Sequence, residues 1–109
     1  MLPKSVTEHV SNDFGRGVKM LADDKPESAL AAFQKSLEEA VGDKKADSLY
    51  NIAVCHVRLG NHDAAREALR QAVALDPSMV SDIAPDEDFA PLRSGGAFEE
   101  IVKRSATST

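Results

Sequence analysis

The chain has 109 residues, of which 42% are hydrophobic and 28% are charged, the balance of an ordinary globular domain. Its net charge of −5 disfavours a nucleic-acid backbone as the main partner, and its longest apolar run, residues 29–33, is too short to cross a membrane. The single cysteine, Cys55, excludes an internal disulfide framework, as is typical of a reducing compartment. The chain lacks a basic start followed by an apolar core, so we expect a soluble, cytoplasmic protein without a signal peptide.

The first predicted helix covers residues 5–22. Its apolar residues recur every three or four positions, at Val10, Phe14, Val18 and Leu21. Gly17 lies inside this helix, where a glycine costs about 1 kcal/mol relative to alanine. We therefore expect a neighbouring helix to approach Gly17 closely.

A second helix is predicted from Pro26 to about Val41. Asp24 and Glu27 have the spacing of a capping box at its start, and Gly42 suits the position that follows a helix. Its apolar face is expected to be buried and comprises Ala29, Leu30, Phe33, Leu37, Ala40 and Val41.

Two further helices are predicted over residues 46–59 and 63–75. The turn between them is Gly60-Asn61, with Asn61 as a candidate N-cap, and Asp76-Pro77 ends the second of the two. The apolar face of the first comprises Leu49, Ile52, Ala53, His56 and Leu59, and that of the second comprises Ala65, Leu69, Ala72 and Val73.

Prolines at 77, 85 and 91 divide the rest of the chain into short pieces. We predict one or two helical turns over residues 78–83, a short segment over 89–93 and a last helix over 97–104. The small polar residues 105–109 are predicted to be disordered.

Residues 46–77 resemble a tetratricopeptide repeat, a helix-turn-helix unit of about 34 residues. The family favours particular residue sizes at eight positions, which here hold Leu49, Ala53, His56, Gly60, Ala65, Leu69, Ala72 and Pro77. Seven of these eight residues fit, and His56 departs because tyrosine or leucine is usual there.

A degenerate repeat precedes this one in the chain. A constant offset of 36 residues aligns Gly17 with Ala53 and Phe14 with Tyr50, so residues from about 11 to 45 resemble a first repeat. It has Asp24 in place of the turn glycine and lacks the closing proline. Its extra length is expected near residues 42–45, in the second helix or the loop after it.

The resemblance implies an all-α fold, a superhelix of two tetratricopeptide-like hairpins closed by a C-terminal helical cap. We expect one domain over residues 1–104, with the first repeat at about 11–45, the second at 46–79 and the cap at 80–104. The cap resembles a tail that often closes such arrays, with Phe89, Leu92 and Phe98 as its anchors. We expect these three residues and Ile101 to cover the exposed face of the fourth helix. Removal of the chain from Pro77 onward should therefore lower the unfolding midpoint sharply.

The resemblance also implies a function, that of a protein-interaction module and not an enzyme. An adaptor or assembly factor of this kind holds a peptide or helix of another protein in a concave groove. The first helix of each repeat would supply the groove residues, which are Phe14, Val18, Asp47, Tyr50, Asn51, Val54 and Arg58.

Each part of that groove has an expected task. Phe14, Val18, Tyr50 and Val54 would form an apolar strip, Asn51 would bind a peptide backbone and Arg58 would pair with a carboxylate. Two alternatives stay open. The C-terminal tail would cover the strip, or a second copy of the chain would bury it in a homodimer. The carboxylate clamp of chaperone-binding members is not expected, since only Asn51 matches it.

The sequence carries no constellation typical of catalysis or of a cofactor. His56 is expected to be a packed imidazole with one hydrogen bond, and no pair of histidines has metal-ligand spacing. Cys55 lies in an apolar run, and the acidic pairs such as Glu38-Glu39 fall on faces expected to be solvated. We therefore expect no metal, no cofactor, no nucleic acid and no membrane insertion.

Overall fold

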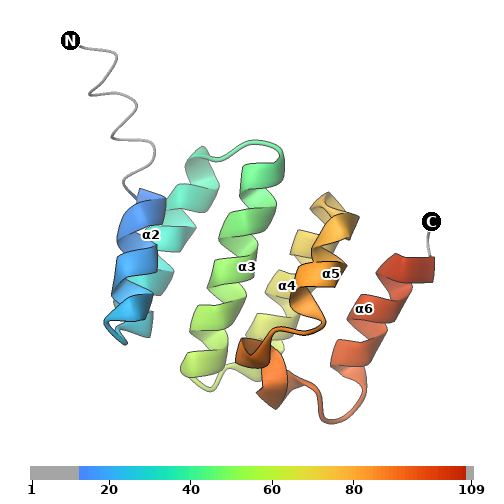
Figure 1. The fold of residues 1–109 in the computed structure, drawn as a ribbon. Coiled ribbons are helices and arrows are strands. Elements are labelled where there is room, and N and C mark those ends of the chain that lie inside the picture. Colours follow the sequence, from blue (N-terminus) through green and yellow to red (C-terminus); the bar gives the residue numbers. More distant parts are fainter. Residues whose placement is uncertain (1–12, 108–109) are drawn as a thin grey trace.

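The computed structural model describes residues 13–107, and all regular structure in that range is helical (Figure 1). Residues 13–22 are helical, and the predicted start of this helix at residue 5 lies outside the described residues. The later elements are α2 (Pro26–Glu39), α3 (Asp43–Arg58), α4 (His62–Leu75), η1 (Pro77–Met79), α5 (Val80–Ile83), η2 (Glu87–Leu92) and α6 (Ala97–Thr107). The predicted all-α fold is confirmed.

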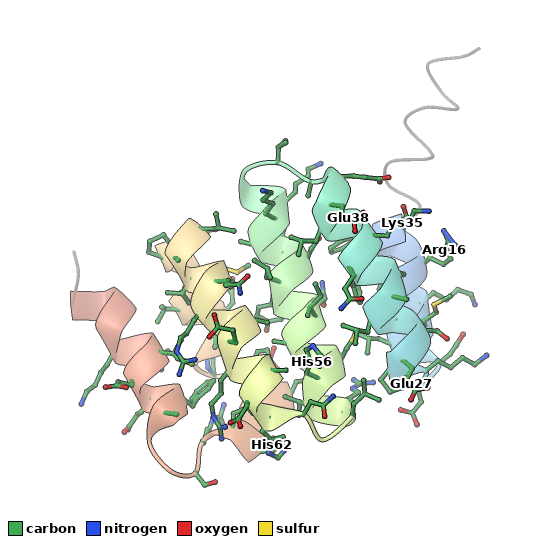
Figure 2. The ribbon with its side chains drawn as sticks, turned by 180° about the vertical axis from the view of Figure 1, so that it is seen from behind. Arg16, Glu27, Lys35, Glu38, His56 and His62 are labelled. Atoms are coloured by element: carbon green, nitrogen blue, oxygen red, sulfur yellow. The ribbon has the colours of Figure 1, made fainter. Side chains whose placement is uncertain are left out.

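The helices are arranged in two layers. Figure 1 shows helix 13–22, α3 and α5 on the near side, with α2 and α4 behind them. Viewed from behind, α2 and α4 come to the front, with α3 between them (Figure 2). Helix α3 packs against both α2 and α4, and α6 packs against α4 at the end of the array. The near layer therefore consists of the first helix of each hairpin, helix 13–22 and α3, followed by α5.

The turn between helix 13–22 and α2 repeats 36 residues later between α3 and α4. The amide of Asp24 donates to the carbonyl of Leu21, as the amide of Gly60 donates to that of Val57. Asp24 has a φ of 60° and Gly60 a φ of 82°, so an aspartate adopts the left-handed conformation of the turn glycine. The same offset relates the two hairpins in three dimensions.

The interior is continuous across both hairpins. Phe33 and Leu69, which share the offset of 36, are completely buried, and Ala29 and Ala65 occupy equivalent buried positions. Gly17 lies against Phe33, and a Cβ added to Gly17 would stand 2.7 Å from two atoms of the phenyl ring. The predicted close approach at Gly17 is confirmed, and the approaching group is a side chain of α2.

The C-terminal segment closes this interior. Phe89, Leu92, Phe98 and Ile101 are all buried, and α6 packs against α4 as predicted for the cap. The segment also extends beyond the fourth helix, because η2 packs against α3. The tail therefore contacts both layers of the second hairpin.

Several boundaries differ from the prediction. Helix α2 ends at Glu39 and leaves Val41 76% exposed beyond its end, although Val41 was expected in the buried face. Gly42 does not cap α2; with a φ of 61° it precedes α3, which begins three residues earlier than predicted. The extra length of the first repeat therefore lies in the first turn of α3, where the chain gains helical hydrogen bonds.

The predicted caps are also corrected. Lys25, not Asp24, occupies the N-cap position of α2. Asn61 occupies the N-cap position of α4 as predicted, but neither Lys25 nor Asn61 caps its helix with a side-chain hydrogen bond. Asp24 cannot act as a cap because its backbone forms the left-handed turn. At the other end of the chain, α6 continues to Thr107, three residues into the segment predicted to be disordered.

Candidate functional site

The near layer contains an open cleft of about 390 Å³. Four elements line it. Helix 13–22 contributes Phe14, the turn η1 and helix α5 contribute Met79 and Asp82, and α3 contributes the remaining residues, Asp47, Tyr50 and Asn51. Residues at i, i+3 and i+4 share one face of a helix, so α3 presents its three side chains together.

Phe14 forms the wall of the cleft that comes from helix 13–22. Its ring meets the ring of Phe33 edge to face, with centroids 5.4 Å apart and an interplanar angle of 74°. Phe14 remains half-buried, so part of its ring faces the cleft while the buried ring of Phe33 holds its orientation.

Tyr50 joins α3 to the C-terminal segment. Its hydroxyl donates a hydrogen bond to Oδ2 of Asp86, and its ring meets Phe89 edge to face with centroids 5.2 Å apart. Burial raises the pKa of Tyr50 above its ordinary value, and the hydrogen bond to Asp86 and the nearby carboxylates raise it further. The neutral phenol is therefore the form that this contact requires.

Asn51 supplies an amide beside the cleft. Its Nδ2 donates to the backbone carbonyl of Asp47 at 3.2 Å, which is the preceding turn of α3, and the side chain is half-buried. A side-chain amide has two donors and an acceptor, so Asn51 has capacity left to pair with a peptide backbone.

The other three residues predicted for the groove lie elsewhere. Val18 is 47% exposed but does not line the cleft. Val54 is 3% exposed, belongs to the core and does not line the cleft. Arg58 donates to the carbonyl oxygen of Leu21 at 3.0 Å and lies 3.9 Å from the carboxylate of Asp88.

The C-terminal tail packs along the face of α3 that contains Val54. Phe89 and Asp88 of η2 contact Tyr50 and Arg58, which lie one turn before and one turn after Val54 on the same face of α3. The tail thus contacts Tyr50 of the apolar strip. Cover of the strip by the tail was one of the two alternatives left open by the sequence. Met79 and Asp82, which the sequence did not assign to the groove, form its third wall instead.

The residues considered for other chemistry are placed as follows. His9 lies outside the described residues. His56 is half-buried between α2 and α4 (Figure 2), and its Nδ1 has no partner among the described residues, so the single hydrogen bond expected there is not seen at this atom. Burial lowers the pKa of His56 and raises that of the buried Cys55 to about 11.

Within residues 13–107, no three or more histidine, cysteine, aspartate or glutamate side chains are grouped as a metal site requires. In the same part of the chain, each helix is too short or too polar to pass through a bilayer.

Comparison with known families decides the identity of the repeats. A family model described as Tetratricopeptide repeat matches residues 18–78, which is more than half of the chain. This chain belongs to the tetratricopeptide repeat family. Tetratricopeptide repeats generally mediate protein–protein interactions and are typically non-enzymatic. The tetratricopeptide repeat match over residues 18–78 includes the whole of α2, α3 and α4. No curated protein and no solved structure matches the chain.

Proposed function

We propose that the protein is a non-enzymatic adaptor or assembly factor that binds a peptide segment or helix of a partner protein in the cleft between helix 13–22, α3 and α5. The observation that carries the proposal is the convergence of four predicted groove residues, Phe14, Asp47, Tyr50 and Asn51, on one open cleft. These residues combine aromatic surface with groups that form hydrogen bonds, which is the usual composition of a binding pocket.

The position of the cleft supports the same proposal. Its lining comes from helix 13–22, α3, η1 and α5, and helix 13–22, α3 and α5 form the near layer of Figure 1. Phe14 packs against Phe33, and Tyr50 contacts Phe89 and Asp86. Both aromatic side chains that line the cleft are therefore fixed before a ligand binds. Preorganised side chains lose little conformational entropy on binding.

The test begins with peptides selected from a random display library on the whole chain, because the natural partner is unidentified. A selected peptide is then titrated into isotopically labelled protein and followed by NMR. We expect the amide signals of residues around the cleft, including Asn51 and Asp82, to shift first. Shifts confined to the reverse face, on α2 and α4, would refute the groove assignment.

A matched pair of variants makes the test specific. Asn51 and Gln71 are both amides that donate to a group one turn earlier on their helix, but Gln71 is exposed on α4. Asn51→Trp should fill the cleft and weaken peptide binding by about tenfold or more, about 1.4 kcal/mol. Gln71→Trp should leave binding unchanged. Light scattering separates peptide binding from homodimer formation, in which the molar mass would rise with protein concentration.

A further inference from the structure

The acidic residues of the chain are concentrated in the segment that forms one wall of the cleft. Residues 76–100 contain seven acidic residues and a single basic one, Arg93, whereas the whole chain carries a net charge of only −5. The rest of the chain is therefore close to neutral. The reverse face carries both signs, as shown by Glu27, Lys35 and Glu38 on α2 (Figure 2).

The lining of the cleft has the same bias. Two of its six side chains are carboxylates, Asp47 from α3 and Asp82 from α5, and none is basic. Asp82 is exposed and forms no hydrogen bond or ion pair with any residue that the structure describes. Its negative charge therefore faces the cleft beside the apolar surfaces of Phe14 and Met79 without a neutralising group.

Two arginines on this side of the molecule, Arg58 and Arg93, are held by other groups. Arg58 is bound to the carbonyl of Leu21 and lies near Asp88. Nη2 of Arg93 donates to the carbonyl oxygens of Ala84 and Asp86, both at 2.9 Å. The exposed Lys44 and Lys45 on the first turn of α3 reduce the field near Asp47, whereas residues 76–92 around Asp82 include no basic residue.

The pKa of Tyr50 reflects the carboxylates around it. After burial and the hydrogen bond to Asp86, the negative charges of Asp86, Asp82 and Asp88 are the further causes that raise the pKa of Tyr50. A negative potential at the edge of the cleft raises the pKa of a phenol, because it disfavours the phenolate. The same potential favours the approach of a cationic ligand.

We infer that the cleft takes a basic side chain of the partner segment, an arginine or lysine next to an apolar residue. This inference rests on the proposed function and specifies its ligand. The aliphatic part of such a side chain would lie along Phe14 and Met79, while its cationic group meets the carboxylate of Asp82. Complementary charges of this kind increase the association rate and exclude acidic partners.

The experiment compares the composition of peptides selected from the random library and then measures one of them by fluorescence anisotropy. We expect enrichment of arginine or lysine beside large apolar residues. Binding should weaken as salt is raised from about 0.05 to about 0.5 M, because the Debye length falls severalfold over that range. Asp82→Asn should weaken binding by about two- to fivefold, the range of exposed ion pairs.

Glu99→Gln is the matched control. It removes the same charge from the same acidic segment, but Glu99 is an exposed residue of α6 and does not line the cleft. We expect the Glu99→Gln variant to bind the peptide as the wild type does. Thermal unfolding of both variants verifies that each is folded at the temperature of the assay.

The outcomes separate the inference from the proposed function. If neutral or acidic peptides bind and shift the signals of the cleft, or if Asp82→Asn binds as tightly as the wild type, the charge preference is overturned and the groove assignment stands. If no selected peptide shifts the signals of the cleft, both are overturned. Loss of affinity in Asp82→Asn with no loss in Glu99→Gln supports both.

Discussion

Tyr50 and Asp86, 36 residues apart in the chain, are joined by a hydrogen bond from the phenol to the carboxylate. Oδ1 of Asp86 also accepts a hydrogen bond from the backbone amide of Asp88 at 2.9 Å. This bond caps the start of η2. Together with the contact between Tyr50 and Phe89, the bond from Tyr50 to Asp86 places the C-terminal segment on the layer that carries the cleft. One relationship thus ties the cap to the groove.

The first prediction concerns alkaline unfolding. Below pH 10.0 the phenol is protonated in both the folded and the unfolded state, so its contribution to stability is complete. Above that pH the unfolded chain releases the proton while folded Tyr50, whose pKa is raised, retains it, so stability falls as pH rises. Tyr50 is the single tyrosine, so tyrosinate absorbance follows it directly. Native protein should titrate above pH 10.0, and denatured protein near it.

The matching variant is Tyr50→Phe. It keeps the ring against Phe89 but removes the donor to Asp86, and we expect a loss of about 1–2 kcal/mol at neutral pH by urea denaturation. The part of the alkaline destabilisation that comes from Tyr50 should disappear in this variant. A native tyrosine that titrates at its ordinary value would contradict the role assigned to the bond.

The second prediction uses two glycines of the same helix. Gly17→Ala should destabilise the protein by about 1–3 kcal/mol, because the added Cβ would stand 2.7 Å from the ring of Phe33. Gly15→Ala meets nothing within 4 Å and should stabilise it by about 0.5–1 kcal/mol through helix propensity. Equal effects in chemical denaturation would show that Gly17 is not at a close contact.

The third prediction concerns the two equivalent turns. Asp24 adopts a φ of 60°, which strains a residue with a Cβ, so Asp24→Gly should raise the free energy of unfolding by about 0.5–1 kcal/mol. Gly60→Asp, the reverse change at the position 36 residues later, should lower it by a similar amount. Thermal melts of both variants measure the effect, and a destabilised Asp24→Gly variant would mean that the aspartate side chain has a stabilising role.

The fourth prediction concerns a buried polar contact between the hairpins. The hydroxyls of Ser36 on α2 and Ser48 on α3 lie 3.2 Å apart, and both residues are buried. Replacing one serine with alanine leaves the other hydroxyl unpaired and should cost about 1–2 kcal/mol. The double variant should cost less than the sum of the single variants, because no unpaired hydroxyl remains. Additive costs in a double-mutant cycle would argue against coupling of the pair.

The fifth prediction concerns the cap. Phe98 on α6 is buried, so Phe98→Ala should destabilise the protein by about 3–5 kcal/mol. Leu75→Ala is the control, since Leu75 is 50% exposed and should cost much less. Truncation before Pro77 removes η1, α5, η2 and α6 together and should lower the melting temperature further. A truncated chain that melts with the full-length protein would show that the cap adds no stability.

Much of the fold follows from local patterns. The four main helices and the offset of 36 could be predicted because apolar residues at helical spacing leave a signal within each segment. The close approach at Gly17 was also predictable, because a glycine inside a helix usually marks a tight contact. The exact ends of the helices were harder to predict, as Gly42 shows. A glycine suits either the end of one helix or the start of the next, and the neighbouring packing selects between them.

The groove was predictable only in part. Phe14, Asp47, Tyr50 and Asn51 follow from the repeat pattern, since the opening helices of successive repeats share one layer. Whether Tyr50 and Arg58 have partners depends on the path of residues 77–92, which is broken by prolines and carries no period. That path is set by contacts between distant segments.

The amino-acid sequence by itself determined the two hairpins, their common offset and most residues of their shared interior, because helical periodicity and turn chemistry are local properties. Tertiary structure alone decided that η2 packs against α3 at Tyr50 and Arg58 and that Met79 and Asp82 complete the cleft. The physical reason is that these positions depend on long-range contacts, such as those of Tyr50 with Asp86 and Phe89, which leave no pattern in either segment alone.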